Sequence, residues 1–480
     1  MRKTKIVCTI GPACADKETI REMIDVGMNV ARLNFSHGNR EWHRKCIKII
    51  QEINAELEFP VATILDLQGP EIRTCNTKPV KANTGDRIRL VANGCENHGD
   101  NVVPINYNSV IEGIRPGDRV YIDDGMIECV AVEKQNGNIV CEVLNGGVIY
   151  GKKSVNIPGT HIRQPTLTEK DKKDIEFGLS LGIDYLALSF VRNEHDIVKV
   201  RGLVEEYETK IIAKIECSAA VENFDNILKV SDAIMLARGD LGVEIAFEKL
   251  PIIQKELIRK CNLSGKPIIV ATHMLNSMIE NPRPTRAEII DVANAVLSGA
   301  DAVMLSGETA IGKYPVEAVK VMDSIVREAE NNIKPNFTIP VSDDVSEIVA
   351  RAVANVSDSL NAKAIISFTE TGNTAKNISK YRVRAPIFVF TPNQKLYKTQ
   401  TLLWGTYFYP INGNSLNEMI ERGIENLKKS GKVSSGDSIV LTAGMRDKET
   451  RSIAEVLSLI HISEPTRPRL ISYAVFCLKK

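Results

Sequence analysis

Two short apolar runs in the middle of the chain, Ile211–Ile215 and Ala233–Ala237, each end in charges of both signs. The charged residues are Lys214 and Glu216 at the first run, and Arg238 and Asp240 at the second. Such runs are typical of strands buried on both faces, which have no structural need for charge. Two carboxylates can hold Mg²⁺, and a neighbouring lysine and arginine can neutralise a phosphoryl group. The pattern therefore favours metal-assisted chemistry on an anion; two ion pairs at a barrel rim are the alternative.

Polar side chains also follow most of the other apolar runs, at the point where each run ends. They are Arg32, Asn34, Ser36 and His37, then Asp66 and Arg73, Ser189, Thr272 and His273, and Ser306 and Glu308. Any one of them could be a cap or a satisfied buried side chain. Their accumulation at one end of the runs favours metal-assisted chemistry on a phosphorylated or carboxylated substrate.

Eight apolar runs alternate with segments of helical periodicity, and this alternation defines the expected fold. The runs are 6–10, 30–33, 61–65, 185–188, 211–215, 233–237, 268–271 and 302–305; the helical segments are 18–26, 41–53, 171–181, 195–207, 252–263, 287–297 and 316–331. Thr168 and Thr285 each stand three residues before an acid, as a capping box requires. Eight successive β/α units predict an α/β fold, the TIM (β/α)8 barrel, whose chemistry lies at the carboxyl ends of the strands.

Residues 69–165 interrupt this alternation. Valine and isoleucine alternate with polar residues there, and turn signals recur at 83–86, 115–118, 123–125, 135–138 and 145–147. Such hairpin signals predict a small β-barrel domain inserted after the third strand. We expect it to act as a lid, because both of its hinges adjoin rim residues; a structural decoration is the alternative. The barrel itself is then expected to comprise residues 1–68 and 166–335.

The chain returns to an α/β pattern after Pro340. A helical segment at 345–360 and strand-like runs at 364–367, 386–390 and 438–441 predict a C-terminal α/β domain over residues 341–456. The loop 369–374 could hold a phosphate through its amides, but Glu370 would repel one, and a plain β/α turn is the alternative. Residues 457–467 resemble the translation of a sequencing adapter, so we expect 457–480 to be a non-native, poorly ordered tail.

Composition narrows the functional classes only slightly. The 480 residues carry a net charge of +1 with 43% apolar residues, which gives no reason to expect nucleic-acid or membrane binding. No apolar run approaches the roughly 20 residues of a membrane helix. The apolar run after Met1 is only as long as a strand, so we expect no secretory leader there. The ten cysteines show no metal-binding spacing, so free thiols in a reducing cytoplasm are expected.

Six segments of the chain resemble the pyruvate kinase family. They are TKIVCTIGPA (4–13), ARLNFSHG (31–38), GPEIR (69–73), AKIE (213–216), ARGDLG (237–242) and NPRPTRAEIIDVANAVLSGADAVMLSGETA (281–310). The last segment is long and highly specific, and the resemblance extends from Met1 to about Val456. It implies a cytoplasmic homotetramer that transfers the phosphoryl group of phosphoenolpyruvate to ADP, giving pyruvate and ATP.

The resemblance also implies which residues act on each substrate. Lys214 would neutralise the phosphoryl group, and guanidinium groups would clamp it, because a loose transition state spreads negative charge over the phosphoryl oxygens. The implied catalytic residues are Lys214, Arg32, Arg73, Thr272 and Ser306. The implied substrate-binding residues are Gly239, Asp240, Thr272 and Ser189. The implied nucleotide-binding residues are Arg32, His37 and Lys153, the last delivered by the inserted domain when it closes.

Two cations are implied as cofactors. The ligands of Mg²⁺ (or Mn²⁺) match Glu216 and Asp240, and the ligands of K⁺ match Asn34, Ser36, Asp66 and the backbone carbonyl of Leu67. Oxygen ligands suit such hard cations. The family divides at the position of Glu71, where glutamate accompanies K⁺ dependence and lysine accompanies independence, because a lysine ammonium can supply the charge itself. Glu71 therefore predicts K⁺ dependence.

Two other functions remain open at the level of sequence. A Mg²⁺-enolate C–C lyase also uses a barrel rim with acidic residues and arginine, but it needs neither Lys214 nor the K⁺ ligands nor a lid. A catalytically impaired homologue acting as a scaffold is the second alternative. The intact Lys214, Glu216, Asp240 and Thr272 speak against a scaffold.

Overall fold

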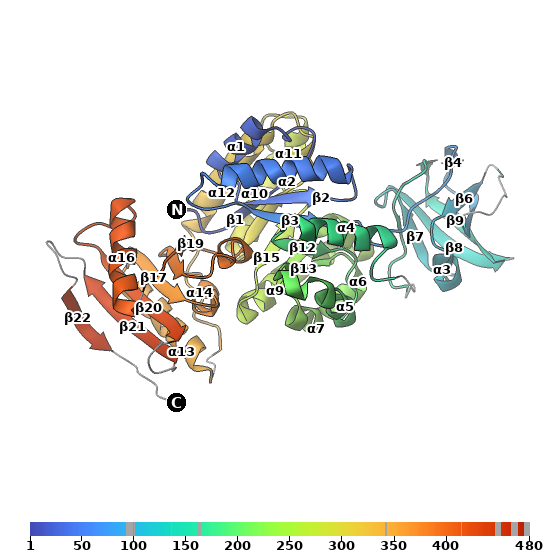
Figure 1. Cartoon of the computed structure of the whole chain (residues 1–480). Helices are drawn as coiled ribbons and strands as arrows, with labels where there is room; N and C mark the ends of the chain where they lie inside the picture. Colours follow the sequence, from blue (N-terminus) through green and yellow to red (C-terminus); the bar gives the residue numbers. More distant parts are fainter. Residues whose placement is uncertain are drawn as a thin grey trace.

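The computed structural model describes residues 1–92, 99, 101–135, 137–160, 165–340, 343–413, 415–446, 453–461 and 469–474. Figure 1 shows three lobes: a central barrel, an inserted β lobe on one side of it, and a C-terminal lobe on the opposite side. The amino terminus lies beside the C-terminal lobe. Among the described residues, no helix combines the length and the apolar character needed to span a membrane.

Eight parallel strands close the central barrel in the order β1-β16-β15-β14-β13-β12-β3-β2. They are β1 (Lys5–Ile10), β2 (Val30–Asn34), β3 (Ala62–Asp66), β12 (Tyr185–Leu188), β13 (Lys210–Ile215), β14 (Ala233–Ala237), β15 (Ile268–Ala271) and β16 (Ala302–Leu305). Aliphatic side chains such as Val7, Ile64 and Met235 fill the interior. The strands are therefore packed on both faces, which explains their continuous apolar runs and confirms the predicted TIM barrel.

Helices surround this barrel, and their outer faces carry polar residues. They are α1 (Lys17–Asp25), α2 (Arg40–Asn54), α4 (Glu169–Ser180), α5 (Glu194–Val204), α6 (Ser218–Glu222), α7 (Phe224–Val230), α8 (Arg238–Glu244), α9 (Leu250–Ser264), α10 (Arg286–Leu297), α11 (Gly307–Ala310) and α12 (Pro315–Glu330). Both predicted capping boxes are confirmed, at Thr168 with Asp171 and at Thr285 with Glu288. The helix start is fixed in each case by reciprocal side-chain to backbone hydrogen bonds.

The inserted lobe is built from a six-stranded sheet, a two-stranded sheet and one short helix. Its elements are β4 (Val80–Ala82), β5 (Arg87–Ala92), β6 (Val102–Ile105), α3 (Asn108–Gly113), β7 (Arg119–Ile122), β8 (Ile127–Gln135), β9 (Asn138–Asn145), β10 (Gly147–Ile149) and β11 (Val155–Asn156). The order of the larger sheet is β11-β7-β8-β9-β5-β6. Bridges from Arg73 to Ser154 and from Thr74 to Ile105 connect its two edges. The hinge segment thus closes the sheet toward the predicted barrel shape.

The C-terminal lobe is a sheet with the order β19-β18-β17-β20-β21-β22. Its elements are α13 (Val345–Ser359), β17 (Ala364–Thr369), α14 (Asn373–Ser379), β18 (Ile387–Thr391), α15 (Leu396–Thr399), β19 (Thr406–Pro410), α16 (Leu416–Lys429), β20 (Ser438–Arg446), β21 (Ile453–His461) and β22 (Arg469–Ala474). The strands from β19 to β20 are parallel. Sequence analysis missed β19, whose Thr-Tyr-Phe-Tyr-Pro sequence lacks an aliphatic run.

The described part of the chain's end contains two strands. The backbone of β21 pairs antiparallel with β20, and β22 pairs with β21. This pairing does not test the expectation that 457–480 is a non-native, poorly ordered tail, which stays a prediction. The rest of that segment, residues 462–468 and 475–480, lies outside the described residues.

Candidate active site

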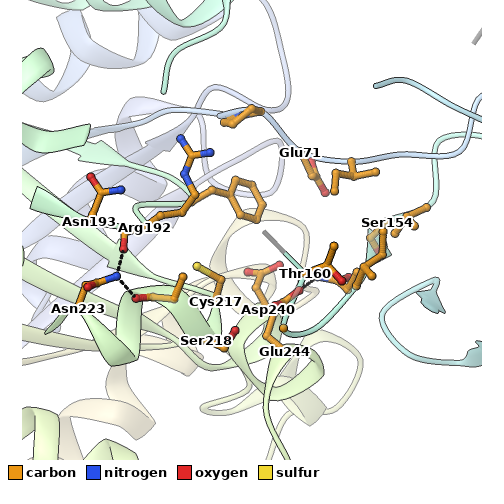
Figure 2. Close-up of a pocket in the computed structure, with 18 residues that line it drawn as sticks. Glu71, Ser154, Thr160, Arg192, Asn193, Cys217, Ser218, Asn223, Asp240 and Glu244 are labelled. Carbon is orange, nitrogen blue, oxygen red and sulfur yellow. Dashed lines mark hydrogen bonds between the residues drawn. The ribbon is translucent and has the colours of Figure 1, made fainter. Parts of the chain in front are cut away.

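A cavity of about 780 Å³ lies between the inserted lobe and the carboxyl ends of strands β12 to β14. Figure 2 shows Asp240 and Glu244 of α8 on one side of it, and Glu71 and Ser154 on the side of the inserted lobe. Asn156 donates a hydrogen bond to Oε1 of Glu244 at 3.1 Å, which links the two lobes directly. The inserted lobe therefore borders the cavity that Asp240 lines, and its action as a lid stays a prediction.

Lys214, at the end of β13, is the centre of a buried ion-pair network. Its Nζ lies 3.1 Å from Oδ1 of Asp66 and 2.9 Å from Oε1 of Glu216, and it donates to Oγ of Ser189 at 2.7 Å. Burial alone would lower the pKa of Lys214, but the two carboxylates outweigh burial and raise the pKa above its ordinary value. The ammonium is therefore charged at neutral pH, as neutralisation of an anion requires.

Asp66, at the end of β3, joins Lys214 to Arg32. Its Oδ2 accepts a hydrogen bond from Nε of Arg32 at 2.6 Å. Burial would raise the pKa of Asp66, but Lys214 and Arg32 outweigh burial and lower the pKa. Nη1 of Arg32 donates to Oγ1 of Thr9 at 3.0 Å, so two partners fix the guanidinium. Sequence analysis missed Thr9, because its only signal was a hydroxyl near the rim end of an apolar strand.

The predicted K⁺ ligands follow two neighbouring strands. Asn34 of β2 and Asp66 of β3 are register partners, and the backbone N–H of Ser36 donates to Oδ1 of Asn34 at 3.1 Å. The carbonyl of Leu67 accepts from the hydroxyl of Ser189 at 2.7 Å. Ser189 is buried. Its hydroxyl contacts both the carbonyl of Leu67, a predicted K⁺ ligand, and the ammonium of Lys214. Each of the four predicted K⁺ ligands can offer an oxygen atom, and oxygen is the donor that hard cations prefer.

Glu216 and Asp240 carry negative charge that the nearby cations do not fully balance. Oε2 of Glu216 accepts from the backbone N–H of Phe190 at 2.8 Å. Burial raises the pKa of Glu216, and Asp240 raises it further although Lys214 opposes this. Burial also raises the pKa of Asp240, with a contribution of the same sign from Glu71. A divalent cation would relieve this repulsion, and carboxylate oxygens are its preferred ligands, so the two residues fit Mg²⁺.

Thr272 follows β15 in an unusual backbone conformation. Its φ is +69°, and that of His273 is +53°. A β-branched residue rarely adopts this region, and such residues cluster at functional sites where the surrounding structure enforces them. In this conformation Oγ1 of Thr272 accepts from the N–H of Gly239 at 2.7 Å and donates to the carbonyl of Ala271 at 2.6 Å. The ends of β14 and β15 are thereby joined at the rim.

Ser306 follows β16 and holds its hydroxyl in a buried position. Its backbone N–H donates to Oε2 of Glu308 at 2.8 Å, and the other carboxylate oxygen accepts from the N–H of Leu275 at 3.0 Å. Oγ of Ser306 has no hydrogen-bond partner among the described residues. An unpaired buried hydroxyl costs about 1–3 kcal/mol, so this position favours a polar partner supplied from outside the protein.

Three of the predicted residues lie apart from the Lys214 network. His37 is exposed, and its carbonyl contacts the ring Nε2 of His43 at 2.9 Å. Lys153 pairs with Asp123 of its own lobe at 2.8 Å. Arg73 lies in the hinge, with its guanidinium 2.6 Å from Oε1 of Glu71. In this arrangement Lys153 and Arg73 thus have carboxylate partners outside the Lys214 network.

Arg238 does not serve the role that its position beside Asp240 suggests. Its guanidinium is buried and lies 2.8 Å from the carboxylate of Asp291 in α10. The physical reason is that α8 begins at Arg238 directly after β14, so the side chain packs against β15 and α10. The expectation that this arginine neutralises a phosphoryl group is therefore wrong. Lys214 and Arg32 remain as the cations inside the network.

Known proteins resemble this chain over nearly its whole length. The family model "Pyruvate kinase, barrel domain" matches residues 1–319, and "Pyruvate kinase, alpha/beta domain" matches residues 347–457. A pyruvate kinase of Geobacillus stearothermophilus is 45% identical over 463 residues, which cover 94% of this chain and 79% of the relative. One of Staphylococcus aureus is 42% identical, covering 94% and 79%. The crystal structure of a pyruvate kinase from Cryptosporidium parvum has a TM-score of 0.90 at 37% identity and covers 96% of each chain.

Proposed function

Because the chain belongs to the pyruvate kinase family and transfers the phosphoryl group of phosphoenolpyruvate to ADP, we propose how its rim residues divide this work. The observation that carries the proposal is the buried network of Lys214, Asp66 and Glu216, which keeps an ammonium charged and fixed in place. Phosphoryl transfer has a loose transition state with negative charge on the phosphoryl oxygens. A preorganised cation stabilises that charge without reorganisation during the reaction.

Arg32 and Arg73 complete the binding of the phosphoryl group in this proposal. Asp66 holds Nε of Arg32 and Thr9 holds its Nη1, which leaves the remaining guanidinium nitrogen for the substrate. Arg73 reaches the site from the hinge, where it now pairs with Glu71. Planar guanidinium groups suit phosphoryl oxygens because they donate two parallel hydrogen bonds.

Two cations act as cofactors in this proposal. Glu216 and Asp240 hold Mg²⁺ (or Mn²⁺), which supplies Lewis-acid stabilisation of the oxygen atoms that gain charge. The raised pKa values of both carboxylates support this assignment. K⁺ is held by oxygen atoms of Asn34 and Asp66, at the ends of β2 and β3, and of Ser36 and Leu67, on the loops that follow. In this proposal each bound cation balances negative charge on the carboxylates that hold it.

The carboxylate and the methylene carbon of phosphoenolpyruvate interact with Gly239, Thr272 and Ser306 in this proposal. The N–H of Gly239, which lies 2.7 Å from the hydroxyl of Thr272, receives the substrate carboxylate. Thr272 and Ser306 then belong to the relay that brings a proton to the methylene carbon of the enolate. The unpartnered hydroxyl of Ser306 supports this role. Proton transfer through hydroxyls and water is effective when the groups are positioned before the reaction.

Arg32, His37 and Lys153 bind the nucleotide, with Lys153 arriving when the inserted lobe closes. Lys153 now pairs with Asp123 in an exposed ion pair, and such pairs contribute little stability and exchange partners readily. Closure excludes water, which would otherwise compete with ADP for the phosphoryl group. A cytoplasmic location is part of the same proposal, because both substrates are small charged metabolites.

Pyruvate formation from phosphoenolpyruvate should require ADP, Mg²⁺ and K⁺ together. Replacing K⁺ with tetramethylammonium should lower the rate by about tenfold or more, because a transition-state charge loses about 1.4 kcal/mol or more of stabilisation. Glu71→Lys should restore activity without K⁺. A coupled assay of pyruvate measures each condition. Activity indifferent to K⁺ would contradict the cation site, and pyruvate formation without ADP would indicate transfer of the phosphoryl group to water.

A homotetramer is the proposed assembly, and one interface is expected on the face formed by α9 and α10. Apolar side chains are exposed there without cover from this chain: Phe247 at 80%, Ile252 at 69% and Ile290 at 59%. Exposed apolar clusters of this kind mark protein interfaces. A second copy of this chain is the proposed occupant.

Ile290→Glu should lower the molar mass in solution by at least half, because it buries a charge in the proposed interface. Multi-angle light scattering measures the mass. Val198→Glu is the matched control, since Val198 is 57% exposed on α5, away from this face. An unchanged mass for Ile290→Glu would show that α10 does not form the interface.

A further inference from the structure

Arg238 is the charged residue of the rim motif to which the proposed catalytic roles assign no task. It stands between β14 and Gly239, yet its guanidinium faces away from the rim carboxylates and toward the end of β15. A buried arginine needs several hydrogen-bond acceptors, because its five N–H groups lose water on burial. The identity of those acceptors shows what the residue does.

The guanidinium of Arg238 connects four elements. Nη2 donates to the carbonyl of Thr272 at 2.7 Å, and Nε donates to the carbonyl of Ala271 at 3.3 Å. Nη1 donates to Asp291 of α10 at 2.8 Å and to Oε1 of Gln254 in α9 at 3.4 Å. Arg238 therefore binds the backbone on which the strained Thr272 lies and anchors it to two helices.

The two carbonyls that Arg238 binds fix the orientation of the Thr272 peptide. Thr272 has its φ at +69°, which an isolated β-branched residue avoids. Charge-assisted hydrogen bonds are strong enough to offset the strain of one residue. Without them, the backbone would relax and carry the hydroxyl of Thr272 away from the N–H of Gly239, which it now meets at 2.7 Å.

We propose that Arg238 is a positioning residue that holds the Thr272 hydroxyl and the Gly239 amide in one geometry. It acts on the reaction only through these two groups, and the inference rests on the roles proposed for them. Arg238 thereby fixes the Gly239 amide, which receives the substrate carboxylate, relative to the Thr272 hydroxyl, which belongs to the relay that brings a proton to the enolate. Lysine cannot replace it, because a single ammonium lacks the planar fork that reaches two carbonyls and a carboxylate together.

The decisive experiment is a double-mutant cycle with Arg238→Lys and Thr272→Val. Two rates are measured: pyruvate formation, and exchange of the pyruvate methyl protons with D₂O in the presence of Mg²⁺, K⁺ and ATP. In the exchange, a C–H bond of the methyl group breaks to give the enolate, and a deuteron from solvent then forms the new C–D bond. We expect Arg238→Lys to lower both rates about tenfold, with the KM for ADP unchanged within about twofold.

The double mutant should be no slower than Thr272→Val alone, within about twofold, because Arg238 acts through Thr272. Arg201→Lys is the matched control, since Arg201 also pairs with a carboxylate (Asp232) and a carbonyl (Val230), but in α5. It should retain both rates. Thermal unfolding by circular dichroism verifies that each variant folds, and Asp291→Asn replaces Arg238→Lys if the latter does not.

Two results would overturn the inference. The first is an Arg238→Lys enzyme with unchanged methyl exchange. The second is a double mutant whose losses multiply, which would show that Arg238 acts independently of Thr272. If Thr272→Val itself exchanges methyl protons at the normal rate, the proposed role of Thr272 fails instead, and the inference fails with it. Failure of Arg238→Lys alone leaves the role of Thr272 intact, so the two failures are distinguishable.

Discussion

Lys214→Met is expected to lower phosphoryl transfer by at least about 10³-fold, the largest effect predicted for any single substitution here. The reason is that removal of a preorganised cation from a phosphoryl-transfer site costs about 10³–10⁵ in rate. The ammonium of Lys214 is held by Asp66 and Glu216 within 3.1 Å, so no other side chain can take its position without rearrangement. A coupled assay of pyruvate formation measures the loss.

The same variant should retain the exchange of pyruvate methyl protons within about tenfold, because we assign that step to Thr272 and Ser306 in the proposal. Lys260→Met is the matched control: Lys260 pairs with Asp225 at 2.9 Å on α9, outside the site. Removal of the ammonium leaves the buried Glu216 without its cation, while Asp66 keeps Arg32, and breaking such a buried pair can cost about 3–5 kcal/mol of folding free energy. Protonation of Glu216, whose pKa is already raised, reduces that cost. Equal loss of transfer and exchange in a folded Lys214→Met enzyme would contradict the division of roles.

The barrel could be predicted from sequence because its strands are buried on both faces. Such strands read as continuous aliphatic runs, and four of them, such as Tyr185–Leu188, match the structure at both ends. The aromatic strand Thr406–Pro410 gave no such run and was missed. Helix starts were predictable where a local rule applies, as at Thr168, because the cap involves residues only three apart.

The site was predictable as a set of residues but not as a set of contacts. The strand-end rule places Lys214, Asp66 and Glu216 at the same rim. Which carboxylate binds the ammonium depends on the register between the barrel strands. Asp66 of β3 is paired with Ala187 of β12. Ala187 is paired in turn with Ile212 of β13, two residues before Lys214. Register between strands far apart in sequence cannot be read from either strand alone.

Arg238 shows the limit of that reasoning most clearly. Its sequence position is equivalent to that of a rim residue, but a helix begins at Arg238 without an intervening loop. The direction of its side chain follows from the backbone of Thr272 and from Asp291, which is 53 residues away in the chain. Conversely, the same helix start brings Gly239 and Asp240 to the rim. One short helix thus combines a structural arginine, a backbone donor and the carboxylate that we propose binds the metal.

The concentration of Mg²⁺ that gives half-maximal binding should rise as pH falls, by up to about tenfold per pH unit for each carboxylate that must lose a proton. Burial raises the pKa values of Glu216 and Asp240 above the ordinary value near 4. Below the raised pKa values a proton occupies the carboxylates and competes with the cation. Above them, the requirement for Mg²⁺ should be independent of pH.

Titration calorimetry with Mg²⁺ measures this dependence without turnover. Asp240→Asn should weaken binding at high pH and reduce the slope toward that of a single carboxylate, because only Glu216 still titrates at the site. Glu288→Gln is the control: the pKa of Glu288 is lowered although burial opposes this, because Ser277 and Thr285 donate to its carboxylate. It lies in the capping box of α10 and should leave the slope unchanged. Binding that is independent of pH down to the ordinary carboxylate range would contradict the assignment of these two residues to the divalent cation, since a pair with raised pKa values must release protons when it binds metal.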